Sequence, residues 1–143
     1  MKVIAIVGSP RKNGNTAFLV NEAMKIIATE GIETGVIHLS GKKIDPCNGC
    51  LQCKKEKHCV IKGDDFESVF SEMKKAEGII LASPVYFGSA TSQMTSLLHR
   101  AAYIRDRQEN TFQERSADLS WSPDGQGIIS PWLNCCSGIS LTT

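Results

Sequence analysis

The chain of 143 residues carries 16 Lys and Arg against 15 Asp and Glu, which leaves a formal net charge of +1. This length predicts one domain with a sizeable hydrophobic core, and the balanced charge argues against a nucleic-acid-binding or membrane-binding surface. The first apolar run has five residues, so we predict neither a signal peptide nor a membrane span, which needs ~20 residues. We therefore expect a cytoplasmic protein whose six cysteines act as metal or redox ligands in preference to disulfide partners.

The chain begins with a pattern of strand, loop and helix. Val3–Val7 is an uninterrupted apolar run, typical of a strand that is buried on both faces in a parallel sheet. A polar loop over residues 8–16 follows, and a helix is predicted from about Thr16 to Glu30. This geometry directs backbone N–H groups and the positive end of the helix dipole at one point, where a phosphate group fits.

The residues of loop 8–16 narrow the choice of phosphate ligand. The loop lacks the Lys-Ser/Thr pair of a Walker A motif and the G-x-G-x-x-G fingerprint of dinucleotide-binding proteins. Its short polar donors suit a terminal phosphomonoester held without a metal ion, as in flavodoxin-like proteins that bind FMN. The candidate ligands are Ser9, Arg11, Asn13, Asn15 and Thr16. The alternative is an ordinary loop whose Ser, Asn and Thr side chains cap the following helix.

Further apolar patterns predict two more strands and two more helices. The strands are Val36–Leu39 and Ile79–Ser83; one helix opens after Asp64-Asp65, and the other spans about Ala90 to Arg105. Apolar residues three and four positions apart give each helix an inward face. In chain order these faces are Phe18, Leu19, Ala23, Met24 and Ile27, then Phe66, Val69, Phe70 and Met73, then Met94, Leu97, Leu98 and Ala101. The alternation predicts an α/β fold with a doubly wound parallel sheet.

A second loop of interest follows the predicted strand Ile79–Ser83. Ligands of parallel α/β sheets bind at the carboxyl ends of the strands, so this loop is expected beside loop 8–16. It offers backbone N–H groups and two aromatic rings that suit a flat ring system. Its residues are Pro84, Val85, Tyr86, Phe87, Gly88 and Ser89. The alternative is a Pro-Gly turn with buried aromatic side chains, but two suitable loops at one edge favour flavin binding.

A compact group of cysteines lies between the second predicted strand and the second predicted helix. Cys47, Cys50, Cys53 and Cys59 have the spacing C-x2-C-x2-C-x5-C within loop 44–63. Thiolates spaced so closely on a tight loop converge on one side, which is typical of an iron–sulfur cluster. Structural zinc sites usually split into two C-x2-C pairs about a dozen or more residues apart. Free thiols, a redox disulfide and an all-cysteine zinc site stay open as alternatives.

These segments together resemble the iron–sulfur flavoproteins, within the NADPH-dependent FMN reductase group of the flavodoxin-like fold. The resemblance covers roughly residues 1–112 and is carried by Ile6–Thr16, the four cysteines and Ala82–Ser89. It implies FMN, a [4Fe–4S] cluster, electron transfer between the two, and a homodimer or tetramer. By this resemblance, Ser9, Arg11, Asn13, Asn15 and Thr16 would hold the FMN phosphate. Residues 84–89 would line the ribityl chain and the isoalloxazine, and the four cysteines would ligate the cluster.

The expected function is therefore that of an FMN-dependent oxidoreductase with a [4Fe–4S] cluster. Its electron donor is expected to be NAD(P)H or a reduced electron-carrier protein. The flavin supplies the chemistry, so no general base or nucleophile is assigned. The alternatives are an NAD(P)H-dependent FMN or quinone reductase without a cluster, a non-catalytic carrier like flavodoxin, and an inactive truncated fragment.

The tail, residues 113–143, departs from the family pattern. It is rich in Ser, Cys and Trp, and no strand or helix period holds after Phe112. We therefore predict a flavodoxin-like domain over 1–112 whose sheet is truncated after the third strand–helix unit, with weak flavin retention. One hypothesis is that the tail is read out of frame. Ser, Cys and Trp codons mostly begin with T, and a shift of two bases makes this T the second base of a codon. Codons with T in the second position encode apolar residues. The alternative is a divergent short C-terminus.

Overall fold

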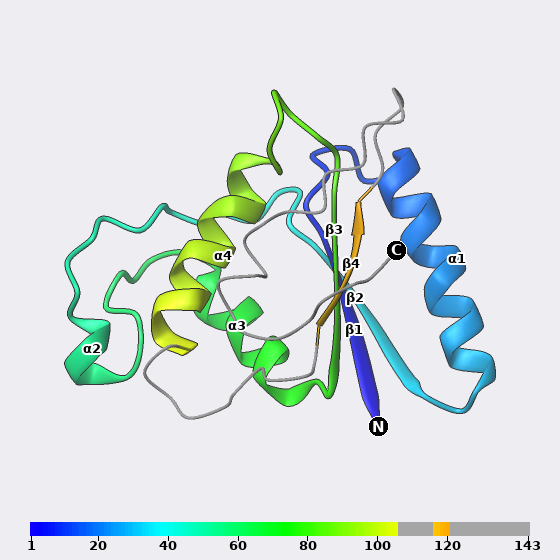
Figure 1. Cartoon of the computed structure of the whole chain (residues 1–143), viewed down its shortest axis with the longest axis horizontal. Coiled ribbons are helices and arrows are strands. Elements are labelled where there is room, and N and C mark those ends of the chain that lie inside the picture. The colour runs from blue at the N-terminus through cyan, green and yellow to red at the C-terminus, as the bar shows by residue number, and fades with distance from the viewer. Residues whose placement is uncertain (106–115, 121–143) are drawn as a thin grey trace, which may run out of the picture.

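A parallel sheet forms the centre of the protein in the computed structural model, which describes residues 1–105 and 116–120 (Figure 1). The strands lie in the order β2-β1-β3-β4. Their bounds are β1 Lys2–Val7, β2 Glu33–His38, β3 Gly78–Ser83 and β4 Ser116–Ser120. This order matches the first four strands of the 2-1-3-4-5 order of flavodoxin-like sheets. The predicted α/β class with a parallel sheet is confirmed.

The predicted truncation of the sheet after the third strand–helix unit is wrong. β4 pairs with β3 in parallel, with Ser116 opposite Ile79 and Ser120 opposite Ser83. Strand pairing uses backbone N–H and C=O groups, so it does not require an apolar run. The segment Ser-Ala-Asp-Leu-Ser also alternates polar and apolar residues, a period that is too short here to predict a strand. The rest of the predicted tail, residues 113–115 and 121–143, lies outside the described residues.

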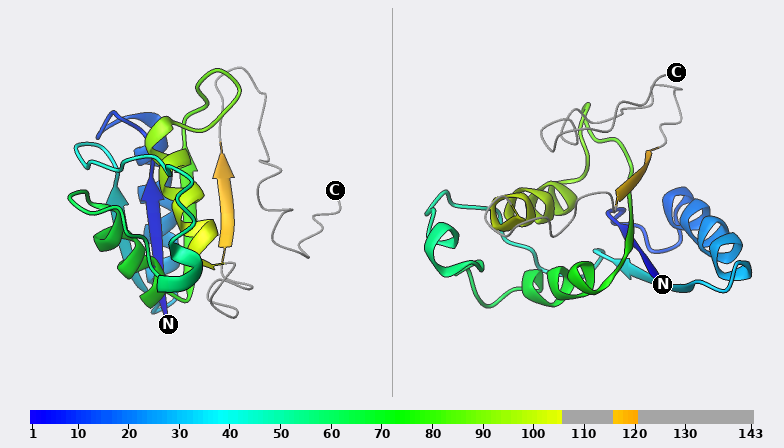
Figure 2. Two further views of the ribbon diagram at one scale, coloured as in Figure 1. Left: turned by 90° about the vertical axis from the view of Figure 1, so that its left-hand side faces the viewer. Right: turned by 60° about the horizontal axis from the view of Figure 1, so that its bottom comes forward.

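Helices cover both faces of the sheet (Figure 2). α1 (Asn15–Thr29) packs on one face, and α3 (Phe66–Lys75) and α4 (Ser92–Arg105) pack on the other. α2 (Cys53–Glu56) is a single turn that lies outside these layers and contacts α4. Across the described part of the chain, no helix combines the length and the apolar character needed to cross a bilayer.

The side chains of β1 alternate between two core clusters. Ala5 and Val7 pack towards α1, whereas Ile4 and Ile6 pack towards α3 and α4. The inward face predicted for α3 is confirmed, because all four of its residues are buried: Phe66, Val69, Phe70 and Met73. In α4, Met94, Leu97 and Ala101 are buried as predicted, and Leu98 is half-buried against the same core.

The inward face predicted for α1 is partly wrong. Phe18 and Leu19 are 65% and 47% exposed, whereas the buried residues are Ala17, Val20 and Met24. Apolar residues occur on more than one side of this helix, so the three- and four-residue spacing fits two faces. Contact with the sheet selects the face with the small residue Ala17, which permits close approach.

Gly8 joins β1 to loop 8–16 at a point of close contact with the residues that begin α4. A Cβ atom at Gly8 would lie 3.0 Å from the Cβ of Met94 and 3.1 Å from the Oγ1 of Thr91. We expect Gly8→Ala to lower the free energy of unfolding by about 1–3 kcal/mol, because the added methyl group overpacks this contact.

Urea denaturation tests this prediction against Gly35→Ala. A Cβ at Gly35 would meet only the Cγ2 of Ile4, at an ordinary 3.6 Å, so we expect little or no loss of stability for that variant. Equal losses in the two variants would contradict the prediction.

Candidate functional site

Loops 8–16 and 84–89 lie at the same edge of the sheet, where β1 and β3 end (Figure 1). The Gly8 N–H donates to the Ala82 carbonyl over 2.7 Å, and the Thr91 hydroxyl donates to the Gly8 carbonyl over 2.8 Å. These bonds tie the start of loop 8–16 to both ends of loop 84–89. The structure therefore brings together the two loops that the sequence predicted at this edge.

Only some of the polar groups of loop 8–16 form hydrogen bonds within the loop. Ser9 is 4% exposed, and its hydroxyl accepts the Arg11 N–H and donates to the Arg11 carbonyl, each over 3.2 Å. α1 begins after Gly14, and no side chain caps its first turn, so the helix-capping alternative is wrong. The predicted ligands whose side chains are exposed or half-buried are Arg11, Asn13, Asn15 and Thr16.

Residues 84–89 contain a tight hairpin turn. Tyr86 and Ser89 exchange two backbone hydrogen bonds, of 2.7 and 3.1 Å. Phe87 and Gly88 have φ values of 49° and 78°, which correspond to a type I′ turn and are strained for phenylalanine. The Tyr86 side chain is 51% exposed and Phe87 is fully exposed, so the alternative of buried aromatics is wrong. Pro84 and Val85 are half-buried, whereas Gly88 and Ser89 are exposed.

His38 ends β2 at the same edge of the sheet. Its Nδ1 atom is buried and has no hydrogen-bond partner within residues 1–105 and 116–120. Buried polar atoms are rarely left unpaired because they lose their hydration. This position therefore suits a polar ligand group or an ordered water molecule.

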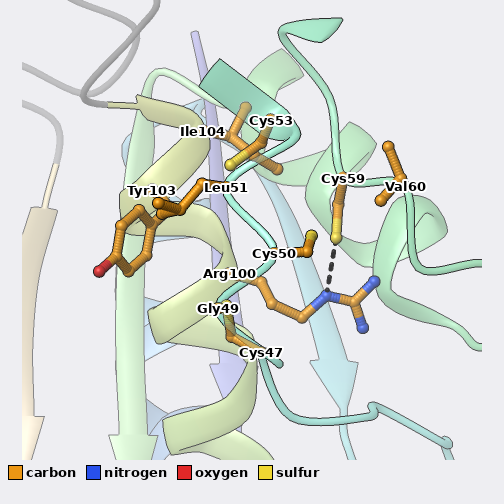
Figure 3. Close-up of a pocket in the computed structure, with 10 residues that line it drawn as sticks. All are labelled: Cys47, Gly49, Cys50, Leu51, Cys53, Cys59, Val60, Arg100, Tyr103 and Ile104. Carbon is orange, nitrogen blue, oxygen red and sulfur yellow. Dashed lines mark hydrogen bonds between the residues drawn. The ribbon is translucent and has the colours of Figure 1, made fainter. Parts of the chain in front are cut away.

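All four predicted cluster ligands line one pocket beside α4 (Figure 3). Gly49, Leu51 and Lys57 have φ values of 70°, 57° and 58°, and these left-handed residues turn the loop sharply between the cysteines. Tyr103 and Ile104 of α4 also line the pocket. The pocket is thus built from a folded-back cysteine loop and one face of α4.

The four thiols are free in this structure. Among the described residues, no group of three or more Cys, His, Asp or Glu side chains is gathered closely enough to hold a metal ion. The cysteines therefore share a pocket but do not converge on a single point.

Arg100 is the main residue of the cysteine pocket that was not predicted from the sequence. Its side chain is only 1% exposed, and its Nε donates to the Cys59 Sγ over 3.3 Å (Figure 3). Its Nη1 and Nη2 donate to the Asp45 and Ile61 carbonyls, each over 3.1 Å, and to both carboxylate oxygens of Asp64. All five guanidinium N–H groups thus have an acceptor on the cysteine loop or immediately after it.

The position of Arg100 in the sequence does indicate that its charge is buried and paired. It lies three residues after Leu97 and four before Ile104, on the buried stripe of α4. A charged residue at such a position is buried only when it is paired. Its guanidinium also lies over the Phe66 ring, with Cζ at 3.9 Å from the ring centroid.

Asp64 is the charged partner of Arg100, and its side chain is 2% exposed. Burial by itself would raise the pKa of this carboxyl. The hydrogen bond from Arg100, the backbone N–H of Asp45 and the positive charge of Arg100 outweigh burial and hold the pKa of Asp64 below its usual value. Asp64 is therefore ionised at neutral pH and ties α3, α4 and the start of the cysteine loop together.

Comparison with known proteins places this architecture in a family. The sequence model of the NADPH-dependent FMN reductase family matches residues 1–127, beyond the boundary predicted at residue 112. The chain is 51% identical over 105 residues to an iron-sulfur flavoprotein of Methanocaldococcus jannaschii, and 35% identical over 105 residues to one of Methanosarcina thermophila. Each match covers 73% of this chain and 54% of the relative, so the chain spans about half the length of these proteins.

Solved structures show the same fold at low sequence identity. A flavone reductase superposes with a TM-score of 0.63 at 18% identity, over 85% of this chain and 43% of that one. The apo form of an NADH:FMN oxidoreductase superposes with a TM-score of 0.54 at 23% identity, over 86% of this chain and 60% of that one. With its flavodoxin-like sheet and the family match over most of its length, the chain belongs to the NADPH-dependent FMN reductase family, in the branch of the iron–sulfur flavoproteins.

Proposed function

We propose that this chain forms the FMN- and cluster-binding part of an oxidoreductase that passes electrons between FMN and a [4Fe–4S] cluster. The observation that carries the proposal is the pocket that Cys47, Cys50, Cys53 and Cys59 line as free thiols, in a chain of the FMN reductase family. The names of the relatives support the same pairing of flavin and cluster.

FMN would bind at the edge formed by loops 8–16 and 84–89. The uncapped first turn of α1 offers backbone N–H groups to the phosphate, with Arg11, Asn13, Asn15 and Thr16 around it and Ser9 shaping the turn. The half-buried Pro84 and Val85 and the exposed rings of Tyr86 and Phe87 would flank the ribityl chain and the isoalloxazine. When bound, FMN supplies the hydride and electron chemistry, and the protein supplies position and electrostatics.

The side chains of the cysteine loop are chemically suited to ligate an iron–sulfur cluster. Four free thiols line one pocket, and within residues 1–105 and 116–120 no carboxylate or imidazole lines it with them. Thiolates are the usual ligands of iron–sulfur clusters. Because the thiols do not converge in the described conformation, we infer that the loop closes further when the cluster is bound. Such coupling of metal binding to folding is common in small cysteine-rich segments.

A cluster-free NAD(P)H-dependent reductase is the second candidate function. The observation that favours it is the lack of a gathered ligand group among the described residues. The iron and acid-labile sulfide content of anaerobically purified protein separates the two functions. Iron and sulfide in equal amounts support the cluster, and flavin without iron supports the reductase.

The electron donor and the assembly are also proposals. The family name indicates NADPH, so we propose NAD(P)H or a reduced carrier protein as donor and a homo-oligomer as the working form. Oxidation of NADPH by the flavin-loaded protein, followed by the loss of NADPH absorbance, tests the proposed donor. A protein that is reduced only by carrier proteins would instead be a flavodoxin-like electron carrier.

The composition of residues 113–143 leads to a proposal about the reading frame of the gene. We propose that residues 113–143 are read in a shifted frame, because the composition turns to Ser, Cys and Trp after Phe112 and, within the described residues, only the short strand β4 continues the fold there. Sequencing the gene tests this directly. A two-base shift that restores an apolar strand and an amphipathic helix supports the proposal, and a gene without such a shift overturns it.

Arg11→Gln tests the phosphate end of the proposed FMN site. Arg11 is exposed, and a hydrogen bond from its charged side chain to the phosphate is worth ~1.5–3 kcal/mol. We therefore expect a loss of FMN affinity of about tenfold or more, with no loss for riboflavin, which lacks the phosphate. Fluorescence titration with both flavins measures this. Lys12→Gln removes the same charge from the same exposed loop and should change FMN affinity much less; equal losses would contradict the assignment.

A further inference from the structure

One of the five hydrogen bonds of the Arg100 guanidinium goes to a proposed cluster ligand. A buried guanidinium needs a counter-charge and acceptors for its N–H groups, and Asp64 with the Asp45 and Ile61 carbonyls supplies these for Nη1 and Nη2. The remaining Nε–H group points at the Cys59 Sγ, at 3.3 Å. Figure 3 shows this bond at the wall of the cysteine pocket.

The Nη contacts fix the direction of the Nε–H group. Asp64 accepts from both Nη atoms, so the plane of the guanidinium cannot rotate without breaking two bonds to a charged partner. The Phe66 ring lies against the same plane, with its centroid at 3.9 Å from Cζ. The donor is thus aimed at Cys59 before any cluster is bound.

A donor aimed at a ligand sulfur acts on the electronics of a cluster. Reduction adds negative charge, part of which resides on the thiolate sulfurs. An N–H donor stabilises that charge, and hydrogen bonds to sulfur are among the features that set the potentials of iron–sulfur clusters. Burial strengthens the effect because little water screens the interaction.

We propose that Arg100 is a positioning residue that raises the reduction potential of the cluster through its Nε–H bond to Cys59 and holds Cys59 at the pocket. This inference rests on the proposed [4Fe–4S] cluster. Asp64 has a different task, because it orients Arg100 without contacting a cysteine sulfur.

The two residues form a matched pair for a test on the reconstituted full chain. Arg100→Gln removes the donor and leaves the Asp64 carboxylate, so the cluster potential should shift to a more negative value. Asp64→Asn keeps the Nε–H donor and retains one acceptor oxygen that orients the guanidinium, but it leaves the Arg100 charge unneutralised. The potential should therefore stay the same or shift to a more positive value. A merely structural role predicts instead that both variants lose cluster to the same extent with no opposite shift.

Redox titration followed by the absorbance and the EPR signal of the cluster measures these potentials. Opposite shifts, or a negative shift in Arg100→Gln alone, support the inference. An unchanged potential in Arg100→Gln overturns it, while a wild-type chain that binds no iron overturns the proposed function itself. Should Arg100→Gln fail to fold, the wild-type protein with ¹⁵N-labelled arginine decides. A ¹⁵N hyperfine coupling in the reduced cluster supports the bond, and its absence overturns it.

Discussion

Asp64→Asn is expected to lower the free energy of unfolding by about 3 kcal/mol at neutral pH, because it leaves the buried Arg100 without its counter-charge. Both side chains are almost fully buried, at 1% and 2% exposure, so water cannot take the place of the lost carboxylate. Asn retains the size of the side chain and one acceptor oxygen, which isolates the effect of the charge. Urea denaturation at constant protein concentration measures the loss.

The exposed pair Glu22–Lys25 provides the control. Its ends lie 2.6 Å apart, yet the side chains are 48% and 72% exposed, so Glu22→Gln should cost no more than about 0.5 kcal/mol. A loss in Asp64→Asn as small as that of the control would show that Arg100 and Asp64 do not hold the cysteine loop to the core.

The ion pair of Asp64 and Arg100 should also make the stability of the protein depend on pH. The pKa of Asp64 is held below its usual value in the folded protein, so its contribution to stability is present above the unfolded pKa of about 4 and is lost as the pH falls through the folded pKa. The stability difference between wild type and Asp64→Asn should therefore narrow as the pH falls below about 4. A difference that widens at low pH would contradict this assignment of charge.

Replacement of any one of Cys47, Cys50, Cys53 and Cys59 by serine is expected to lower the iron content by about tenfold or more. Changes to residues that merely support metal ligands already cost 10- to 100-fold in affinity, and loss of a thiolate ligand should cost at least as much. Iron and sulfide analysis of anaerobically purified variants measures this. The flavin content should stay unchanged, because the cysteines do not line loops 8–16 and 84–89.

Cys135→Ser and Cys136→Ser are the matched controls for this series. Both positions lie outside the cysteine loop and outside the described residues, and we expect wild-type iron content in each. Iron loss in these controls equal to that in the four loop variants would contradict the assignment of the cluster to residues 47–59.

The parts of the fold that follow from local pattern were predictable from the sequence. The uninterrupted apolar run that becomes β1 fits only a strand buried on both faces, and the stripe of α3 has one helical period and one possible buried face. The α1 face was harder to predict, because Phe18 and Leu19 are as apolar as the residues that the sheet selects. β4 was missed because a short strand can be held by backbone pairing with its neighbour, which leaves little trace in its own residues.

The candidate site was likewise predictable where it depends on local sequence pattern and strand topology, and not where it depends on contacts between distant residues. The edge of the sheet where loops 8–16 and 84–89 meet was predictable from parallel topology. The spacing of the cysteines predicted converging thiols, whereas the thiols of the described residues line one pocket without converging. Arg100 was not predicted, because its partners Asp45, Cys59 and Asp64 are between 36 and 55 residues away along the chain. Only the fold shows that the charged side chain of Arg100 on α4 contacts the cysteine loop.

The proposed function requires that this chain bind both FMN and an iron–sulfur cluster. The most direct test is the absorption spectrum of the anaerobically purified protein before and after dithionite. We expect flavin bands over a broad iron–sulfur shoulder, with both bleached by the reductant. Flavin bands without the shoulder, or a colourless protein after anaerobic reconstitution with FMN, iron and sulfide, would contradict the proposed function.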